Sequence, residues 1–183
     1  MEAFFEEIVD RFYSMLYRFG LSLTRNEADA CDLTQQTFSL WASKGHLLRD
    51  KTKVKSWLFT TLYREFISHR RRQMRWAKDD VWMEKDELPC AMPTTVDCLE
   101  ARQVMECLQA MNETFRAPLV LYYLQEHSYR EIAEILSIPV GTVMSRLSRG
   151  KQKLKKTLLG RQRREGPHSI PMLQLYQVQV RCN

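Results

Sequence analysis

The 183-residue sequence predicts an all-α protein made of two small helical domains joined by a flexible linker. Three observations lead to this prediction: Gly and Pro number only six each, helix-forming residues abound, and apolar residues recur at steps of three and four in two separate blocks. The blocks place one domain at 1–78, a linker at 79–97, a second domain at 98–160 and a tail of unknown role at 161–183.

The first block contains three predicted helices. The first carries a stripe of apolar residues from Phe5 to Phe19, which Gly20 and the polar stretch TRNEADACD interrupt. The second covers roughly 28–43. Residues 45–55 are predicted to form a loop, and the third helix then begins with VKSWLFTTLYREF and ends in consecutive arginines.

The segment 79–97 differs from both blocks in composition. It holds six acidic residues against one lysine, includes Pro89 and Pro93, and shows no helical stripe. This pattern is typical of a linker. Its acidity could shield basic faces of the free protein, and the alternative is a plain solvated spacer.

The second block predicts a helix-turn-helix within SYREIAEILSIPVGTVMSRLSRGKQKLKK, residues 128–156. Ser128 and Glu131 have the spacing of a capping box, which marks the start of a helix. Pro139 disfavours helical geometry in the residue before it and so ends that helix. The side chains expected to face inward from the first helix are Tyr129, Ile132, Ala133 and Leu136.

Charge distribution favours a nucleic-acid partner for the second helix of this motif. The chain has a net charge of +6 and a pI near 9.1, and nine Lys and Arg residues but no acid lie between Glu134 and Glu165. A helix that enters the major groove meets phosphates, which repel carboxylates. The alternative is that cations merely complement a helix C-terminus. That alternative accounts for Lys155 and Lys156 but poorly for Arg146 and Arg149.

A second basic stretch, RDKTKVKSWLFTTLYREFISHRRRQMRWAK, interleaves aromatic residues with its charges. Unstacked bases stack on aromatic rings while Lys and Arg meet the backbone, so this composition suits single-stranded nucleic acid. The alternative is that most of these rings, such as Trp57 and Phe66, belong to the core. The loop LLRDKTKVK is the better candidate for a base pocket.

Other classes of function find little support in the sequence. The five cysteines and four histidines are scattered without ligand spacing, so we expect no metal and no cofactor. No nucleophile–base arrangement indicates an enzyme. The apolar runs fall short of the ~18 residues that a membrane span needs, and the N-terminus lacks the basic region of a signal peptide. We therefore expect a soluble, cytoplasmic protein without membrane insertion.

Three separated motifs, EADACDLTQQTFSLW, KVKSWLFTTLYREFISHRRR and SYREIAEILSIPVGTVMSRLSRGKQKLK, together resemble a bacterial sigma factor of the extracytoplasmic-function group over residues 4–158. The resemblance implies a region-two domain, a flexible linker and a region-four domain. It also implies a dissociable subunit of RNA polymerase that directs promoter recognition, DNA melting and transcription initiation, without a catalytic centre of its own. The alternative is a free-standing helix-turn-helix regulator whose first block senses a signal or dimerises.

The resemblance assigns expected roles to three sets of residues and implies an anti-sigma protein as a further partner. The set matching the motif that docks on the clamp helices of the largest polymerase subunit is Asp32, Gln35, Gln36 and Phe38, of which Phe38 is expected to pack. The set matching the part that melts and reads the minus-ten element of promoter DNA is Lys53, Lys55, Ser56, Trp57, Arg64, Ser68 and Arg71. The set matching the minus-thirty-five reader is Thr142, Met144, Ser145, Arg146, Ser148, Arg149 and Lys151.

Three positions depart from the family pattern. The family often has Asn where Arg64 stands and Asp where Ser68 stands, and usually Arg or Lys where Met144 stands. Met144 offers an apolar contact, for example to a thymine methyl group, in place of the paired hydrogen bonds that Arg or Lys would donate to guanine. The general role survives these changes, but a promoter sequence cannot be transferred from relatives.

Overall fold

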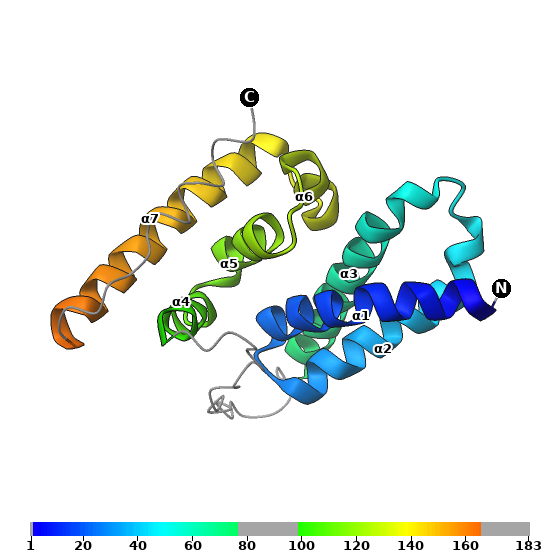
Figure 1. Ribbon diagram of the computed structural model, residues 1–183, viewed down its shortest axis with the longest axis horizontal. Coiled ribbons are helices and arrows are strands. Elements are labelled where there is room, and N and C mark those ends of the chain that lie inside the picture. The colour runs from blue at the N-terminus through cyan, green and yellow to red at the C-terminus, as the bar shows by residue number, and fades with distance from the viewer. Residues whose placement is uncertain (1, 77–98, 166–183) are drawn as a thin grey trace.

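The computed structural model describes residues 2–76 and 99–165. The predicted linker at 79–97, and the predicted tail from residue 166 onward, lie outside the described residues. Within the described ranges every regular element is helical, so the all-α prediction is confirmed. Figure 1 shows two groups of helices, α1 to α3 from the first block and α4 to α7 from the second.

The first group consists of α1 (Glu2–Thr24), α2 (Glu27–Lys44) and α3 (Val54–Trp76). Each of these helices packs against the other two, with α1 and α2 in the most extensive contact. The predicted interruption of the first stripe at Gly20 is wrong, because Leu21 and Leu23 are also buried and α1 continues for another turn. Gly20 lies directly against Ala30, which lets α1 and α2 approach closely.

The predicted loop at 45–55 contains no complete α-helix but is more ordered than expected. It holds two 3₁₀ turns, η1 (Gly45–Leu47) and η2 (Lys51–Lys53), and α3 begins within it at Val54. The Asp50 carboxylate accepts a hydrogen bond from the Thr52 N–H at 3.0 Å. A Cβ atom on Gly45 would lie 2.6 Å from the Trp41 ring, so the close approach requires glycine.

The second group consists of α4 (Leu99–Gln109), α5 (Glu113–Leu119), a π-helical turn η3 (Val120–Leu124), α6 (Tyr129–Leu136) and α7 (Val140–Glu165). The predicted capping box is confirmed: Ser128 Oγ accepts from the Glu131 N–H at 3.3 Å, and the Ser128 N–H donates to the Glu131 carboxylate at 2.8 Å. Helix α6 ends at Leu136 because Ser137 is left-handed, with φ of 52°.

The inward face expected for α6 needs one correction. Ile132, Ala133 and Leu136 are buried, but Tyr129 is 38% exposed. As the first residue of α6, Tyr129 lies at the surface against the Tyr122 ring. Ile135 is fully buried in its place, so the apolar face of α6 is rotated relative to the predicted one.

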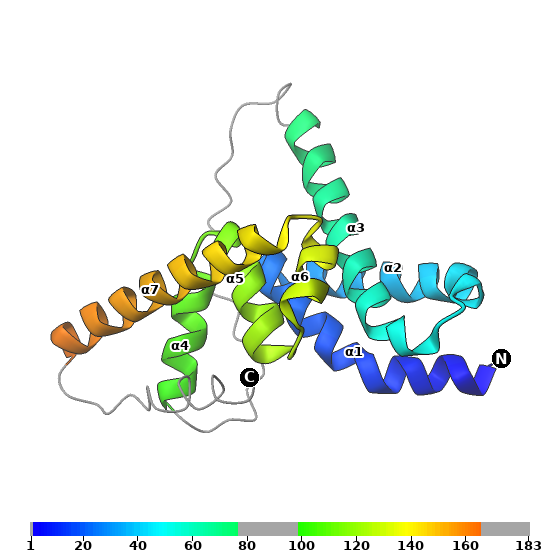
Figure 2. The same cartoon turned by 90° about the horizontal axis from the view of Figure 1, so that it is seen from above.

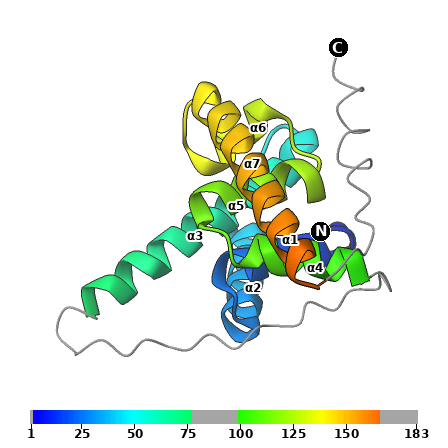
Figure 3. The ribbon, with the colours of Figure 1, turned by 90° about the vertical axis from the view of Figure 1, so that its left-hand side faces the viewer.

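The two groups are not separate bodies in the described part of the chain, because their buried apolar side chains form one core. Helix α6 packs on α3, and α5 packs on α1 (Figure 2). The buried Arg116 guanidinium donates to the carbonyls of Gln109 and Met111 and, across the boundary, to that of Leu23 at 3.3 Å. The C-terminal half of α3 projects beyond this joint bundle (Figure 3).

Candidate nucleic-acid interface

Helix α7 presents the predicted minus-thirty-five set on its outer face. Val143 is fully buried and Leu147 nearly so, which fixes the rotation of the helix. Gly150 lies close to Leu119 of α5, where a Cβ atom would be 3.1 Å from the Leu119 side chain. The exposed members of the set are Met144, Ser145, Ser148 and Arg149.

Three members of the same set are less exposed. Thr142, Arg146 and Lys151 are half-buried. Arg146 lies close enough to Tyr63 of α3 to affect the pKa of its hydroxyl group. Burial raises the pKa of Tyr63, and the positive charge of Arg146 opposes that rise. Arg146 therefore faces the boundary between the two groups, whereas Arg149 faces solvent.

Helix α3 holds most of the predicted minus-ten set. Leu58, Phe59 and Leu62 are fully buried and anchor one face of the helix. Trp57 is half-buried with its ring edge-on to Trp41 at 5.2 Å, so it is partly a core residue. The exposed members of the set are Lys53, Arg64, Ser68 and Arg71.

Arg64, Ser68 and Arg71 follow one another at steps of four and three, which places them on one face of α3. Together with Tyr63 they line a groove whose opposite wall is Leu136 of α6 and the turn that follows it. The groove is therefore bordered by both groups. Its basic side belongs to α3.

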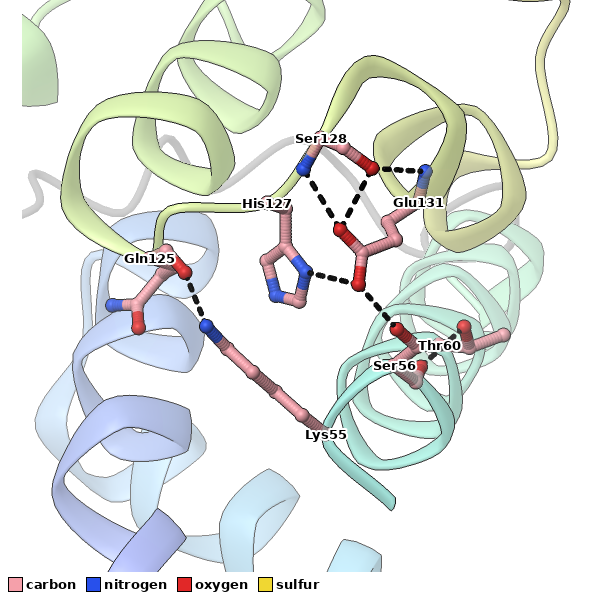
Figure 4. Close-up of polar contacts among 7 residues, drawn as sticks. All are labelled: Lys55, Ser56, Thr60, Gln125, His127, Ser128 and Glu131. Carbon is pink, nitrogen blue, oxygen red and sulfur yellow. Dashed lines mark hydrogen bonds and ion pairs between the residues drawn. The ribbon is translucent and has the colours of Figure 1, made fainter. Parts of the chain in front are cut away.

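The remaining members, Lys55 and Ser56, are engaged by the second group (Figure 4). The Lys55 ammonium donates to the Gln125 carbonyl, and Ser56 Oγ donates to the Glu131 carboxylate at 3.1 Å. Loss of solvent around Lys55 lowers the pKa of its ammonium, against the opposing effect of Glu131. The start of α3 is thus covered rather than open.

His127 fills the centre of this contact and was not anticipated from the sequence. The residue as a whole is 2% exposed, and its ring lies edge-on to Phe59 with 4.7 Å between centroids. Neither ring nitrogen has a hydrogen-bond partner among the described residues, and Nδ1 is 3.8 Å from Glu131 Oε1. Burial, reinforced by the Lys55 charge, lowers the pKa of His127 to about 4, so the ring is neutral near pH 7.

Glu131 has two tasks at this point. It completes the capping box of α6 and also accepts from Ser56 of the other group. Burial acts to raise the pKa of its carboxyl group, but hydrogen bonds from Ser128 and Ser56 outweigh that effect and lower the pKa overall. The carboxylate therefore stays ionised at neutral pH.

Helix α2 carries the predicted polymerase-docking set. Asp32, Gln35 and Gln36 are exposed on one side of the helix, and Gln36 donates to Glu65 of α3 at 2.9 Å. Phe38 is 6% exposed and stacks on Tyr13, as expected of a packing residue. The exposed polar side of α2 is therefore held in place by Phe38 from within.

Among the described residues no group of three metal-ligating side chains comes together. No helix in the same ranges is long and apolar enough to cross a membrane.

Comparison with known proteins settles the family. The model of Sigma-70 region 2 matches residues 8–75, and that of Sigma-70 region 4 matches residues 101–154. The chain is 31% identical over 155 residues to the ECF RNA polymerase sigma factor SigM of Bacillus subtilis, an alignment that spans 82% of this chain and 92% of that protein. The chain belongs to the extracytoplasmic-function sigma factors. It is a promoter-recognising transcription initiation factor.

Other relatives of this sigma factor agree with that conclusion. SigW of Bacillus subtilis is 27% identical over 169 residues, covering 84% of this chain and 88% of that protein. The sigma factor RpoE of Bartonella quintana, solved in complex with the anti-sigma factor NepR, superposes with a TM-score of 0.76 at 27% identity. That superposition covers 86% of this chain and 98% of the other, so it includes helices from both groups. CnrH, solved with the cytosolic domain of CnrY, shares the fold with a TM-score of 0.62 at 20% identity.

Proposed function

We propose that this sigma factor binds core RNA polymerase through the exposed side of α2 and positions the polymerase on two promoter elements, one read by α7 and one by α3. In this division, residues 1–78 act as the region-two domain, 79–97 as the linker and 98–160 as the region-four domain. The family matches at 8–75 and 101–154 fall inside the two proposed domains. The clamp helices of the largest polymerase subunit are the proposed docking partner.

The observation that carries the DNA-reading part is the outer face of α7. Met144, Ser145, Ser148 and Arg149 lie exposed in the half of the helix that enters a major groove, and no acidic residue lies between Glu134 and Glu165 to repel phosphate. Arg149 can donate two hydrogen bonds to a base or a phosphate, while Met144 supplies an apolar contact. This combination supports recognition of a duplex element.

The minus-ten role of α3 has a different basis. Arg64, Ser68 and Arg71 form an exposed basic face, and Lys53 precedes it in the ordered turn before the helix. Cations beside Tyr63 and Trp57 suit a melted strand whose bases are unstacked. The sigma factor supplies positioning and strand capture, and nucleotide addition belongs to the polymerase, so we assign the chain no catalytic centre and place it in the cytoplasm with its template.

An anti-sigma protein is a further proposed partner. The structural relative RpoE was solved bound to the anti-sigma factor NepR, and this chain shares its fold across both groups of helices. The exposed basic face of α3 and the groove beside it provide a surface that an acidic partner could occupy.

Run-off transcription with reconstituted polymerase on a library of promoter fragments tests the proposal directly. We expect initiation from a subset of fragments that share two spaced elements, and no initiation without the sigma factor. A pull-down of core polymerase tests the docking face. The double variant Asp32→Ala with Gln35→Ala should lose binding, whereas Ser43→Ala, exposed on the same helix, should not. Regulation of a gene by the chain without any association with polymerase would overturn the proposal.

A further inference from the structure

The loop of 3₁₀ turns that joins α2 to α3, residues 45–53, carries an apolar side chain that does not pack into the core. Leu47 is 69% exposed, the largest value for any large apolar residue within the described ranges. Figure 1 shows this loop, in cyan, at the end of the molecule where α1 begins. Single exposed apolar residues are common on protein surfaces, so exposure alone assigns Leu47 no role. What distinguishes Leu47 is the order and the charge of the loop around it.

The loop holds Leu47 in a fixed place. On one side, Gly45 lies directly against a buried ring of α2, and the Leu48 N–H donates to the Gly45 carbonyl at 3.1 Å. Leu48 itself is half-buried and packs against the core. On the other side, the Lys51 ammonium lies 4.9 Å from the centre of the Phe4 ring on α1. Leu47 is therefore exposed on an ordered turn that is held at both ends.

The charges beside Leu47 favour a nucleic-acid partner. Three exposed cations follow it in the loop: Arg49, Lys51 and Lys53. The one acid of the loop is Asp50, and its carboxylate accepts from the Thr52 N–H at 3.0 Å and from the Thr52 hydroxyl at 2.5 Å. An apolar tip with cations beside it suits DNA, because the faces of the bases are apolar and the backbone is anionic.

A contact with polymerase is the other use of an exposed leucine, and the position of Leu47 argues against it. The proposed docking set lies further back along α2, since about 13 Å of helix, at ~1.5 Å per residue, separates Gln35 from Lys44 at the end of α2. Leu47 lies beyond that end, in the loop that leads through the exposed Lys53 into α3. It is thus continuous with the proposed minus-ten surface.

We propose that Leu47 is an apolar wedge that enters the base stack of the minus-ten element as the two strands separate, while the cations of its loop hold the adjacent phosphates. The inference rests on the proposed function of α3 as the minus-ten reader. Apolar side chains, leucine among them, insert between base steps in proteins that kink DNA, and they partially unstack those steps. Leucine carries no polar side-chain group, so covering the face of an unstacked base with it needs no compensating hydrogen bond.

Transcription from paired and pre-opened templates tests the wedge in the complete holoenzyme. The template is a promoter fragment recovered from the run-off library, either fully paired or with a short run of mismatched pairs across its minus-ten element. Leu47→Ala should reduce run-off from the paired template about tenfold, which corresponds to ~1.4 kcal/mol. Run-off from the pre-opened template should stay nearly unchanged, because its strands are already apart. An equal loss on both templates, or no loss on either, would overturn the wedge.

Two further variants separate the wedge from other roles. Leu47→Met keeps an apolar side chain of similar volume, so it should transcribe the paired template nearly as well as the unaltered chain. Leu159→Ala makes the same truncation at an exposed leucine of α7 and should have no effect on either template. All these variants should bind core polymerase equally in a pull-down. Weaker binding by Leu47→Ala would make Leu47 a docking residue, and a loss in Leu47→Met equal to that in Leu47→Ala would show that apolar volume is not what matters; either result contradicts the wedge.

A binding experiment with the free chain keeps the wedge distinguishable from the proposed function. The probes are two fluorescein-labelled duplexes of equal length, one fully paired and one with a mismatched run at its centre. The unaltered chain should bind the mismatched duplex several-fold more tightly. Leu47→Ala should lose this preference and keep its affinity for the paired duplex.

The two sets of results can then be read separately. If the preference depends on Leu47 but no promoter fragment supports run-off, the proposed function fails and the wedge stands. If run-off succeeds but the unaltered chain shows no preference, or Leu47→Ala retains it, the wedge is overturned and the proposed function stands.

Discussion

The two helices assigned to DNA in this sigma factor, α7 and α3, present their functional faces in opposite ways. On α7 the reading side chains face solvent, and its buried side consists of neighbours within the same group, such as Leu147 against the second-group core. On α3 the first functional residues, Lys55 and Ser56, are bonded to the other group. The DNA-reading face of α7 is therefore exposed in this structure, because packing within its own group orients it. The start of α3 becomes exposed only when the two groups separate.

The largest expected effect tests the packing that orients α7. Leu147 is 7% exposed, and Leu147→Ala should lower the free energy of unfolding by about 2–5 kcal/mol because it leaves a cavity beneath the reading face. Leu159 lies on the same helix but is 43% exposed, so Leu159→Ala is a matched control with a much smaller effect. Chemical denaturation measures both. Similar losses for the two variants would mean that α7 is not anchored as described.

The next effect concerns the exposed face itself. Arg149→Ala should weaken duplex binding by about 1–3 kcal/mol and reduce the salt dependence of that binding. Lys156→Ala, exposed nearer the end of α7, should weaken it less, because the major groove is entered by the N-terminal half of such a helix. Fluorescence anisotropy over a range of salt concentrations gives both quantities. An unchanged affinity for Arg149→Ala would remove this residue from the reading set.

The sequence predicted the features that depend on local spacing. The capping box at Ser128 and Glu131 and the all-α class were both predictable, because helix starts and apolar stripes are encoded within a few residues. Two local features were misjudged: the interruption of the apolar stripe at Gly20 of α1 and the inward position of Tyr129 on α6.

What the sequence could not supply are contacts between distant segments. His127 is one of four scattered histidines, and no motif around it indicates that its ring packs on Phe59. The half-burial of Lys55 likewise depends on a carbonyl seventy residues away. The one signal in the sequence is charge: the acidity of the linker suggests a shield for the basic faces, but the linker lies outside the described residues. The carboxylates that actually face α3 belong to the second group.

A change of pH should distinguish the two helices, because His127 lies at the contact with α3 and not on α7. The pKa of His127 is about 4 while its contact with α3 is closed and near the ordinary 6.5 when that contact is open, so below pH 6.5 the open form binds a proton that the closed form does not. The contact between His127 and α3 is therefore fully stable above pH 6.5 and weakens as pH falls toward 4. Between pH 7 and 5.5 the open fraction should rise roughly tenfold, which corresponds to ~1 kcal/mol.

The lowered pKa of His127 already reflects the charged groups around its ring. Lys55 from α3 opposes protonation of the ring, Glu131 from α6 favours it, and Arg11 of α1 acts on Lys55. The ratio of amine labelling at Lys55 to that at the exposed Lys53, measured by mass spectrometry at each pH, gives the fraction of molecules in which this contact is open. His127→Gln should remove the pH step, and a step that persists in this variant would assign the titration to another group.

The smallest expected effect isolates the outer contact between α3 and α5. The Arg70–Glu113 pair is partly exposed, with side chains 47% and 18% accessible, so Glu113→Gln should weaken the contact between α3 and the second group by only about 0.2–1 kcal/mol. Glu134→Gln makes the same change at an exposed position of α6 and should leave Lys55 labelling unaltered. Because salt screens an exposed pair, the difference between the two variants should shrink as ionic strength rises. A difference that grows with salt would mean that the Arg70–Glu113 pair does not hold α3 against the second group, and that the contact depends instead on buried side chains such as His127.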